Sequence, residues 1–336
     1  MRFIGVDLHT TQMTVCYLRT SEDYRFKKYG LDEMASFVAD LKASDELAVE
    51  ATGNTRWLVN LVREKVGRVV IVNPREFEVI KQSVKKTDQR DALNLARFLA
   101  VDMLPAVRAK SEQAELVQSL NETRSKFVRL KTSLLNKIHA LAVGRGRKLK
   151  KESVSSGRGL EKVLSAEWTA GERVELEIIV EQIRGLKESI RRIDKALEAE
   201  AEKLAGFENL ITVTGIGARS AGVLLSIIGE VEDFADANKL ASYFGIVPKV
   251  SNSNERINHG RITKRGNKSG RTTLVQCTLV ALRYNSYLKK YYEQVKARRG
   301  HGKAKIATAR KYLGIIYNTL KNKWVFADFN NFELAE

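Results

Sequence analysis

The stretch FIGVDLH, residues 3–9, decides the fold of the N-terminal region because it places a carboxylate inside an apolar run. Such a run predicts a buried strand, and an ionised Asp7 within it is costly unless it binds a cation or hydrogen-bond donors. A second run, LAVEAT, carries Glu50 at its end in the same manner. We therefore expect Asp7 and Glu50 to lie on neighbouring strands of one sheet.

The sequence around these two acids alternates between strand and helix patterns. Strands are expected at residues 3–8, 13–19, 24–29, 46–50 and 68–73, and helices at 32–42, 54–66 and 87–101. A meander that feeds a parallel crossover in this order is the arrangement of ribonuclease-H-like domains. The expected result is an α/β domain over residues 1–106, followed by regions that are mainly helical.

A second pair of acids, Asp88 and Asp91, begins the last of these helices in the segment KKTDQRDALNLA. Residues three apart share a helix face, although Thr87 or Asp88 as an N-cap with an acid in the first turn would explain the pattern equally well. In a ribonuclease-H-like domain this helix packs across the sheet beside the first strand. All four carboxylates would then converge on a site for two Mg²⁺ ions that flank a scissile phosphate.

The central region, residues 107–206, is expected to be helical and to include a coiled coil. A helix over residues 111–143 carries an apolar stripe formed by Leu116, Leu120, Phe127, Leu130, Leu134 and Ile138. A later helix carries a heptad seam formed by Leu176, Ile179, Ile183, Leu186, Ile190, Ile193 and Leu197. The partner of this seam is either the first helix or a second subunit. The Gly-, Ser- and Lys-rich segment 144–171 between the helices predicts a mobile basic loop.

The charge is concentrated in one C-terminal segment. The chain carries 58 basic and 40 acidic residues, a net charge of +18, and residues 249–311 hold 17 basic and two acidic residues, an excess of 15. A concentrated basic surface favours a nucleic acid, because it releases counterions from the phosphate backbone. A solvated basic face or an anionic lipid surface is the alternative, but Gly, Asn, Ser and Tyr interrupt the segment and disfavour an amphipathic membrane helix.

Composition also narrows the cellular setting. The two cysteines, Cys16 and Cys277, are far apart in the sequence and favour neither a disulfide framework nor a zinc site. No apolar stretch approaches the roughly 18 residues that a membrane span needs. We therefore expect no membrane partner and a cytoplasmic location.

The C-terminal region, residues 207–336, carries two further motifs. Gly215 and Gly217 lie between apolar helical runs, a pattern typical of a helix-hairpin-helix that binds phosphate, or of an ordinary helical hairpin with a glycine turn. Residues 245–271 predict a polar loop in which Ser251 or Ser253 either attacks a phosphate or acts as a turn residue. Helices at 271–299 and 303–323 are expected to close the chain.

Several of these blocks, in this order, resemble the DEDD transposases of insertion-sequence family 110, which are related to the Piv DNA invertase. The blocks are GVDLH, VEATGN, VVIVNP and KKTDQRDALNLARFL in the N-terminal region, and LITVTGIGARSAGVLLSIIGEV, GIVPKVSNSN and GRITKRGN in the C-terminal region. The resemblance implies an N-terminal RuvC-like domain, a C-terminal transposase domain with a serine nucleophile, and guidance by a bridge RNA that the element encodes.

The resemblance also implies which residues do the chemistry. The four acids of the family match Asp7, Glu50, Asp88 and Asp91, which would bind Mg²⁺. Counted from Pro248 the serine is Ser253, although Asn254 stands where the family has glycine, so that Ser251 stays an alternative. Contacts to nucleic acid are expected from Gly215, Gly217, Arg256, Arg261, Lys264, Arg265, Asn267, Lys268 and Arg271.

The expected function is therefore an RNA-guided DNA recombinase of an insertion sequence that forms a covalent 5′-phosphoserine intermediate. Its partners would be donor and target DNA, the guide RNA and further copies of the chain, as a dimer that assembles into a tetramer on the nucleoid. A RuvC-like junction resolvase that uses water as nucleophile is the main alternative. An ATPase of the actin-like superfold and a non-enzymatic nucleic-acid-binding protein are the others.

Overall fold

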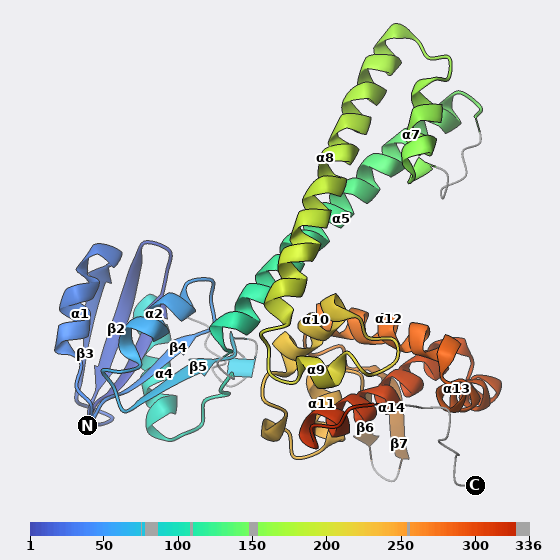
Figure 1. Ribbon diagram of the computed structural model, residues 1–336. Helices are drawn as coiled ribbons and strands as arrows, with labels where there is room; N and C mark the ends of the chain where they lie inside the picture. The colour runs from blue at the N-terminus through green and yellow to red at the C-terminus, as the bar shows by residue number, and fades with distance from the viewer. Residues whose placement is uncertain (75, 78–86, 108–109, 148–153, 254–255, 327–336) are drawn as a thin grey trace. The chain divides into compact units, whose positions relative to one another are not determined.

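The computed structural model describes the chain except for residues 75, 78–86, 108–109, 148–153, 254–255 and 327–336, and describes only the backbone at 250–253 and 256–259. The described residues form two compact units, Met1–Ala109 and Lys110–Glu336 (Figure 1). The first unit contains a sheet with helices, whereas the second is mostly helical. The expected mixture of an N-terminal α/β region and a largely helical remainder is confirmed.

The first unit is built on a five-stranded sheet with the order β3-β2-β1-β4-β5. Its strands are β1 (Phe3–Leu8), β2 (Gln12–Leu18), β3 (Tyr24–Gly30), β4 (Glu46–Glu50) and β5 (Arg68–Val72). The first three strands form an antiparallel meander, and β1, β4 and β5 run parallel. The helices are α1 (Met34–Asp40, after the 3-10 turn Leu31–Glu33), α2 (Thr55–Val62) and α4 (Asp88–Ala100). The predicted order of elements is thus confirmed in this unit.

Strand alternation gives this sheet two different faces. On one face Ile4 and Val6 pack with residues of α1 and α2, such as Phe37 and Leu58. The opposite face is covered by α4, whose Ala92 and neighbouring residues pack against β2 and whose later turns pack against β4 and β5. The odd-numbered residues of β1 therefore face α4.

Gly5 lets α4 approach β1 closely. A Cβ atom at this position would lie 2.0 Å from the carbonyl oxygen of Ala92 and 2.6 Å from the backbone nitrogen of Ala96. Because real Cβ atoms essentially never come that close to backbone, this packing requires glycine. The first turn of α4 is consequently held beside the last residues of β1.

A buried ion pair fixes the other end of β1. The Arg2 guanidinium donates from Nε to Asp45 Oδ1 at 3.0 Å and from Nη2 to Asp45 Oδ2 at 2.6 Å. Both residues are buried, and the Lys42 N–H also donates to the Asp45 carboxylate. Burial by itself would raise the pKa of Asp45, but the hydrogen bonds from Arg2 and Lys42 outweigh it and hold this pKa below its ordinary value.

The second unit begins with two long helices, α5 (Glu112–Gly144) and α8 (Ala170–Ala201), which lie side by side (Figure 1). Ion pairs join Arg145 to Glu172 and Arg124 to Asp194, so residues late in one helix meet residues early in the other and the pair is antiparallel. The seam of α8 is covered by two neighbours in the same chain: Leu176, Ile179 and Ile183 pack with Ile138 of α5, and Leu197 lies against Gly222 in a later helix. Along it Leu176, Ile179, Ile183, Ile190 and Leu197 are buried, whereas Leu186 and Ile193 are half-buried.

Two expectations for this region are wrong. The apolar stripe predicted on α5 is buried only in part: Ile138 is fully buried, whereas Leu116 and Leu130 are 43% and 53% exposed, and the small Ala114 and Ala142, outside the stripe, are buried. Different parts of α5 meet different neighbours, since the Gln118 side chain near its start donates to the Ser226 carbonyl whereas Ile138 near its end packs with Leu176 of α8, and one stripe therefore does not stay buried along its length. The predicted mobile loop contains a helix, α7 (Gly157–Leu164), whose Leu160 and Val163 are buried against α5 and α8. Residues 148–153 of that segment lie outside the described residues.

The rest of the second unit is a helical assembly with one small sheet. Its helices are α9 (Phe207–Leu210), α10 (Ala218–Ile228), the 3-10 turn Val231–Asp233, α11 (Ala237–Tyr243), α12 (Lys268–Tyr284), α13 (Ser286–Arg299) and α14 (His301–Lys321). Its core includes Leu224 of α10, Leu274 of α12 and Leu313 of α14. The Asn121 amide of α5 donates to the Ser269 hydroxyl of α12 at 2.7 Å, so the long helices are tied to this assembly. The boundary expected near residue 206 stays a prediction.

Two further expectations are corrected here. Residues 245–271, expected as a polar loop, contain the antiparallel hairpin β6 (Pro248–Ser253) and β7 (Arg256–Ile262). The single helix expected over 271–299 is two helices, because the Asn285 side chain accepts a hydrogen bond from the Leu288 N–H at 2.9 Å and caps α13. None of the helices in the described ranges combines the length and apolar character that crossing a bilayer requires.

Candidate active site

Asp7 lies on the face of the sheet that α4 covers. Its register partner on β2 is Thr14. The Asp7 side chain keeps 19% of its surface exposed. Burial raises the pKa of Asp7 above its ordinary value, His9 opposes that rise, and the nearby carboxylates of Asp91 and Asp88 add to it. These interactions place three acids and one histidine in a common electrostatic environment.

Asp88 and Asp91 reach this environment from the first turn of α4. The Thr87 hydroxyl accepts the Arg90 N–H at 3.3 Å and is the N-cap, so Asp88 is not needed as the cap. Asp91 is buried at 7% exposure, whereas Asp88 is partly open to solvent. The close contact of α4 at Gly5 is what brings this turn to the end of β1.

Glu50 reaches the same face of the sheet from β4. The parallel register pairs Val6 of β1 with Val49 of β4. Asp7 and Glu50 are the residues directly after this pair, so they occupy matching positions on adjacent strands. Ala48, two residues before Glu50, packs against α4-side residues, and strand alternation puts Glu50 on the same side. The sheet therefore brings Asp7 and Glu50 to neighbouring strand ends.

His9 is a member of the cluster that the sequence analysis missed. Its Nε2 lies 3.2 Å from Asp7 Oδ2 and 3.6 Å from Asp88 Oδ1. One ligand atom from each of Asp7, His9 and Asp88 falls within 4.8 Å of the others, and this group of described side chains does not include Glu50 or Asp91. The available signal was its position in FIGVDLH, two residues beyond the aspartate in the strand.

The cluster fits a divalent cation. Ligand atoms at about 2.0 to 2.4 Å from one ion are about 3 Å apart at adjacent positions and about 4 to 5 Å apart at opposite positions. The His9 nitrogen lies 3.2 and 3.6 Å from the two carboxylate oxygens, and all three ligand atoms lie within 4.8 Å of one another. The Thr14 side chain, paired with Asp7, is fully buried, and its hydroxyl has no hydrogen-bond partner within the described part of the chain. Buried polar atoms are rarely left in this way, and an ion at Asp7 or its bound water would supply a partner. Asp7, His9 and Asp88, with Glu50 and Asp91 beside them, are the residues that would hold it.

The hairpin of the second unit carries the two candidate serines. Ser253 is the last residue of β6 and pairs with Arg256, and Ser251 pairs with Asn258. Residues two apart on a strand face the same side, so the backbone register does not choose between the serines. Their side chains and that of Arg256 lie outside the described atoms, as does all of Asn254.

The predicted nucleic-acid residues around this hairpin divide into exposed and structural positions. Arg261, Lys264, Arg265 and Lys268 are exposed. By contrast the Asn267 side chain accepts the Gly270 N–H at 3.0 Å and caps α12. The Arg271 guanidinium donates to the carbonyls of Phe244 at 3.2 Å and Gly266 at 2.9 Å. The last two side chains therefore hold the loop that presents the basic residues.

The glycines of the predicted helix-hairpin-helix have different surroundings. Gly215 has a φ of +97°, and a Cβ there would lie 2.7 Å from the Cys277 carbonyl of α12. Gly217 is the N-cap of α10, and a Cβ there would meet open space. A phosphate could therefore approach the backbone at Gly217, whereas the backbone at Gly215 is packed against α12.

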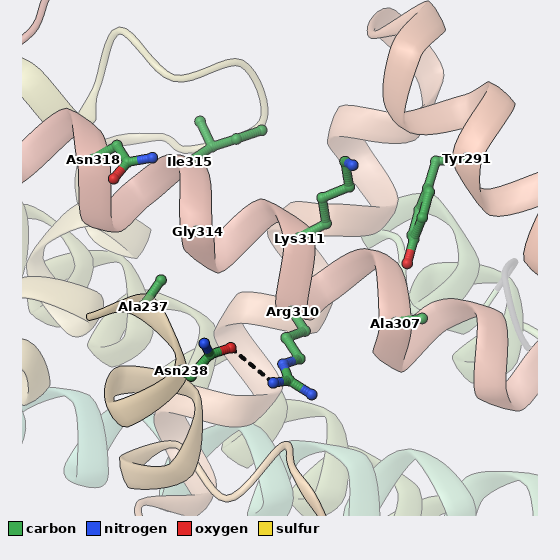
Figure 2. A pocket seen from close by; sticks show the side chains of 9 residues that line it. All are labelled: Ala237, Asn238, Tyr291, Ala307, Arg310, Lys311, Gly314, Ile315 and Asn318. Carbon is green, nitrogen blue, oxygen red and sulfur yellow. Dashed lines mark hydrogen bonds between the residues drawn. The ribbon is translucent and has the colours of Figure 1, made fainter. Parts of the chain in front are cut away.

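A hollow in the second unit adds basic and aromatic side chains that the sequence analysis did not single out (Figure 2). It has a volume of about 540 Å³ and lies between α11, α13 and α14. The Arg310 guanidinium donates to Asn238 Oδ1 at 2.8 Å, and Lys311 Nζ lies 4.7 Å from the ring centre of Tyr291 and 4.9 Å from that of Tyr287. Cations and tyrosine rings in one hollow are typical of surfaces that bind phosphate backbone and bases.

Comparisons with known proteins cover both units. Residues 4–145 match the model of the DEDD transposases of the IS110 type, described as "Transposase", and residues 207–293 match the one described as "Transposase IS116/IS110/IS902 family". A probable family 20 transposase of Pseudomonas aeruginosa is 27% identical over 68% of this chain and 69% of its own length. The transposase for insertion sequence element IS1111A of Coxiella burnetii is 23% identical over 95% of this chain and 90% of its own length. The pilin gene-inverting protein of Moraxella bovis is 25% identical over 96% of this chain and 97% of its own length.

Proposed function

Because the chain belongs to the IS110 family of insertion-sequence transposases, we propose that it cuts and rejoins DNA by a cation-dependent reaction at Asp7, Glu50, Asp88 and Asp91. The observation that carries the proposal is the cluster that the end of β1 forms with the first turn of α4, beside which Glu50 ends the neighbouring strand β4. The strand order and the position of α4 support a RuvC-like fold for this unit. When bound, Mg²⁺ would neutralise phosphate charge and stabilise the attacking and leaving oxygens.

The protein side chains prepare this site before any substrate binds. Asp7 and Asp91, which lie in buried surroundings, hold fixed positions on a strand and a helix. Asp88 and His9 are partly open to solvent, so a phosphate would meet these two side chains first. Rigid placement of this kind removes the cost of ordering ligands during the reaction.

We assign the nucleophile to Ser253, with Ser251 as the alternative. Attack of the Ser253 Oγ on phosphorus forms the Oγ–P bond and breaks the bond to the 3′ oxygen. The serine loses a proton and the departing 3′ oxygen gains one, so that a 5′-phosphoserine and a free 3′ hydroxyl result. The energy of the phosphodiester is kept for rejoining. Ser253 lies at the turn end of the hairpin, where it pairs with Arg256 inside the most basic segment of the chain, and this placement supports the assignment.

The nucleic-acid partners follow from the charge and from the family. The 15 excess positive charges of residues 249–311 and the hollow around Arg310 and Lys311 favour contacts to donor and target DNA. We further propose that a bridge RNA chooses both DNA sequences, that copies of the chain assemble as a dimer and then a tetramer, and that the reaction takes place on DNA in the bacterial cytoplasm. The similarity to a transposase of an insertion sequence element and to a pilin gene-inverting protein supports the proposed cutting and rejoining of DNA.

A junction resolvase that uses water is the second candidate. The observation that favours it is that, among the described side chains, the residues grouped for a cation all come from the first unit. Such an enzyme would cut DNA by hydrolysis and leave no covalent intermediate.

A cleavage assay tests the cation-dependent step. We expect purified protein to cut DNA that carries the element ends when Mg²⁺ is present, and to lose that activity with EDTA or with Asp91→Asn. Glu64→Gln, at an exposed acid of the same unit, is the matched control and should cut like the wild type. Cleavage by Asp91→Asn at the rate of the control would refute the role of the cluster.

A further inference from the structure

We propose that His9 is a nitrogen ligand of the divalent cation bound by Asp7 and Asp88, and that the site therefore binds Mn²⁺ more tightly than Mg²⁺. The inference rests on the proposed function only in assuming that a cation binds at this cluster. It adds a ligand, and with it a metal preference, to a site otherwise made of carboxylates.

The first argument is the convergence of the cluster on one nitrogen. Asp7 Oδ2 and Asp88 Oδ1, which come from a strand and from a helix 81 positions later in the chain, lie 3.2 Å and 3.6 Å from His9 Nε2. An ion about 2.1 Å from each of these three atoms fits between them with small side-chain movements, because the atoms already lie within 4.8 Å of one another. Ligands on three sides leave further positions open for water and a phosphate oxygen.

The second argument is that the backbone of His9 is held on both sides. Its N–H donates to the Gln12 carbonyl at 2.9 Å, which closes the turn between β1 and β2. Its carbonyl accepts the Asn54 amide at 2.8 Å, from the N-cap position of α2. A solvated surface histidine needs no such support, whereas a metal ligand gains affinity from it.

The third argument is independent of the charged residues. The Thr14 hydroxyl is fully buried on the strand position opposite Asp7, and the described residues give it no hydrogen-bond partner. A cation on Asp7 with a bound water would supply one. The polar atom therefore points to a ligand at Asp7 that the protein itself does not provide.

The chemistry of the donors sets the metal preference. Mg²⁺ prefers oxygen ligands and is reluctant to exchange its water for nitrogen. First-row transition cations accept an imidazole nitrogen together with carboxylates. A site with two carboxylates and one histidine should therefore favour Mn²⁺ over Mg²⁺ more strongly than carboxylates alone would, and removal of the histidine should reduce that preference.

The test uses the full chain loaded with Mn²⁺ alone. Pulsed electron paramagnetic resonance of bound Mn²⁺ should show the nitrogen modulation of a ligated imidazole, and His9→Gln should abolish it. His139→Gln, at a histidine of the other unit, should leave it unchanged. In calorimetric titrations His9→Gln should weaken Mn²⁺ binding by about tenfold or more, the loss seen when groups that support metal ligands are removed, and should change Mg²⁺ binding far less.

The alternative is that His9 only forms an ion pair with the two aspartates. Bound Mn²⁺ without nitrogen modulation in the wild type, or modulation that persists in His9→Gln, would overturn the inference. So would equal losses of Mn²⁺ and Mg²⁺ affinity. A wild type that fails to bind Mn²⁺ overturns it too, and cleavage in Mg²⁺, measured on the same protein, then shows whether the proposed function fails with it.

Discussion

Substitution Gly5→Ala tests how the fold builds the acidic cluster. The added Cβ would lie 2.0 Å from the Ala92 carbonyl oxygen, and ordinary contact begins near 3.4 Å, so α4 must move away from β1 by about 1.4 Å. The obstructing atoms belong to the backbone, and no side-chain rotation relieves the contact. Overpacking of this kind costs about 1 to 3 kcal/mol.

The same displacement has a second consequence at the site. Asp88 and Asp91 move with α4, whereas Asp7 stays on β1. A misplacement of about 1 Å at reacting groups lowers a rate by about 100-fold. We therefore expect Gly5→Ala to lower both the stability of this unit and the rate of Mg²⁺-dependent DNA cleavage, with the larger effect on cleavage.

Amide hydrogen exchange in α4 and β1 measures the loss of stability that Gly5→Ala should cause. A loss of 1 to 3 kcal/mol corresponds to protection lowered by about 5- to 150-fold at the most stable amides. Gly53→Ala is the matched control in the same unit, because a Cβ there meets nothing within 4 Å. Unchanged protection in Gly5→Ala, together with wild-type cleavage, would show that close packing at Gly5 does not position the acids.

Other parts of the structure give two more predictions. Asp45→Asn leaves the buried Arg2 guanidinium with Asp40 as its remaining acidic partner, at 3.3 Å, and should lower the free energy of unfolding by about 1 to 3 kcal/mol in urea titrations. The exposed Asp32→Asn should not reproduce this loss. The pKa of Asp45 is lower in the folded protein than in the unfolded chain, so its contribution to stability is complete above the unfolded pKa and is lost as the pH falls through the folded pKa. If Asp45→Asn lowered the free energy of unfolding by the same amount at pH 2 as at neutral pH, this explanation would be wrong. Replacement of both Arg310 and Lys311 by alanine should weaken binding to DNA of any sequence and reduce the slope of log affinity against log salt by about 2, because each of the two cations would neutralise one phosphate. An unchanged slope would exclude the hollow as a DNA-binding surface.

The sheet and the acids at its strand ends were predictable because their signals are local. Each strand is a short apolar run bounded by turn residues, and Asp7 stands out within such a run whatever the rest of the chain does. The helix that begins at Asp88 was equally clear from its N-cap pattern. Their close approach depends on Gly5, whose importance appears only when α4 lies on top of it.

The features that were missed depend on interactions between distant parts of the chain. His9 is anchored by Asn54, which is 45 positions away, and no local pattern indicates that bond. Residues 248–262 are rich in Ser, Asn and charged side chains, a composition typical of loops, and they form strands because the two segments pair with each other. The break at Asn285 is the exception among the missed features, because an asparagine that caps the helix beginning at the next residue is a local signal.

The most direct test of the central claim is to trap the covalent intermediate. We would incubate the protein with Mg²⁺, donor and target DNA and the RNA encoded beside the element, then denature the mixture and measure protein that stays attached to a 5′ DNA end. The account predicts an adduct for the wild type and for Ser251→Ala, and none for Ser253→Ala or Asp7→Asn. DNA cut without an adduct, or an adduct that survives Ser253→Ala, would contradict it.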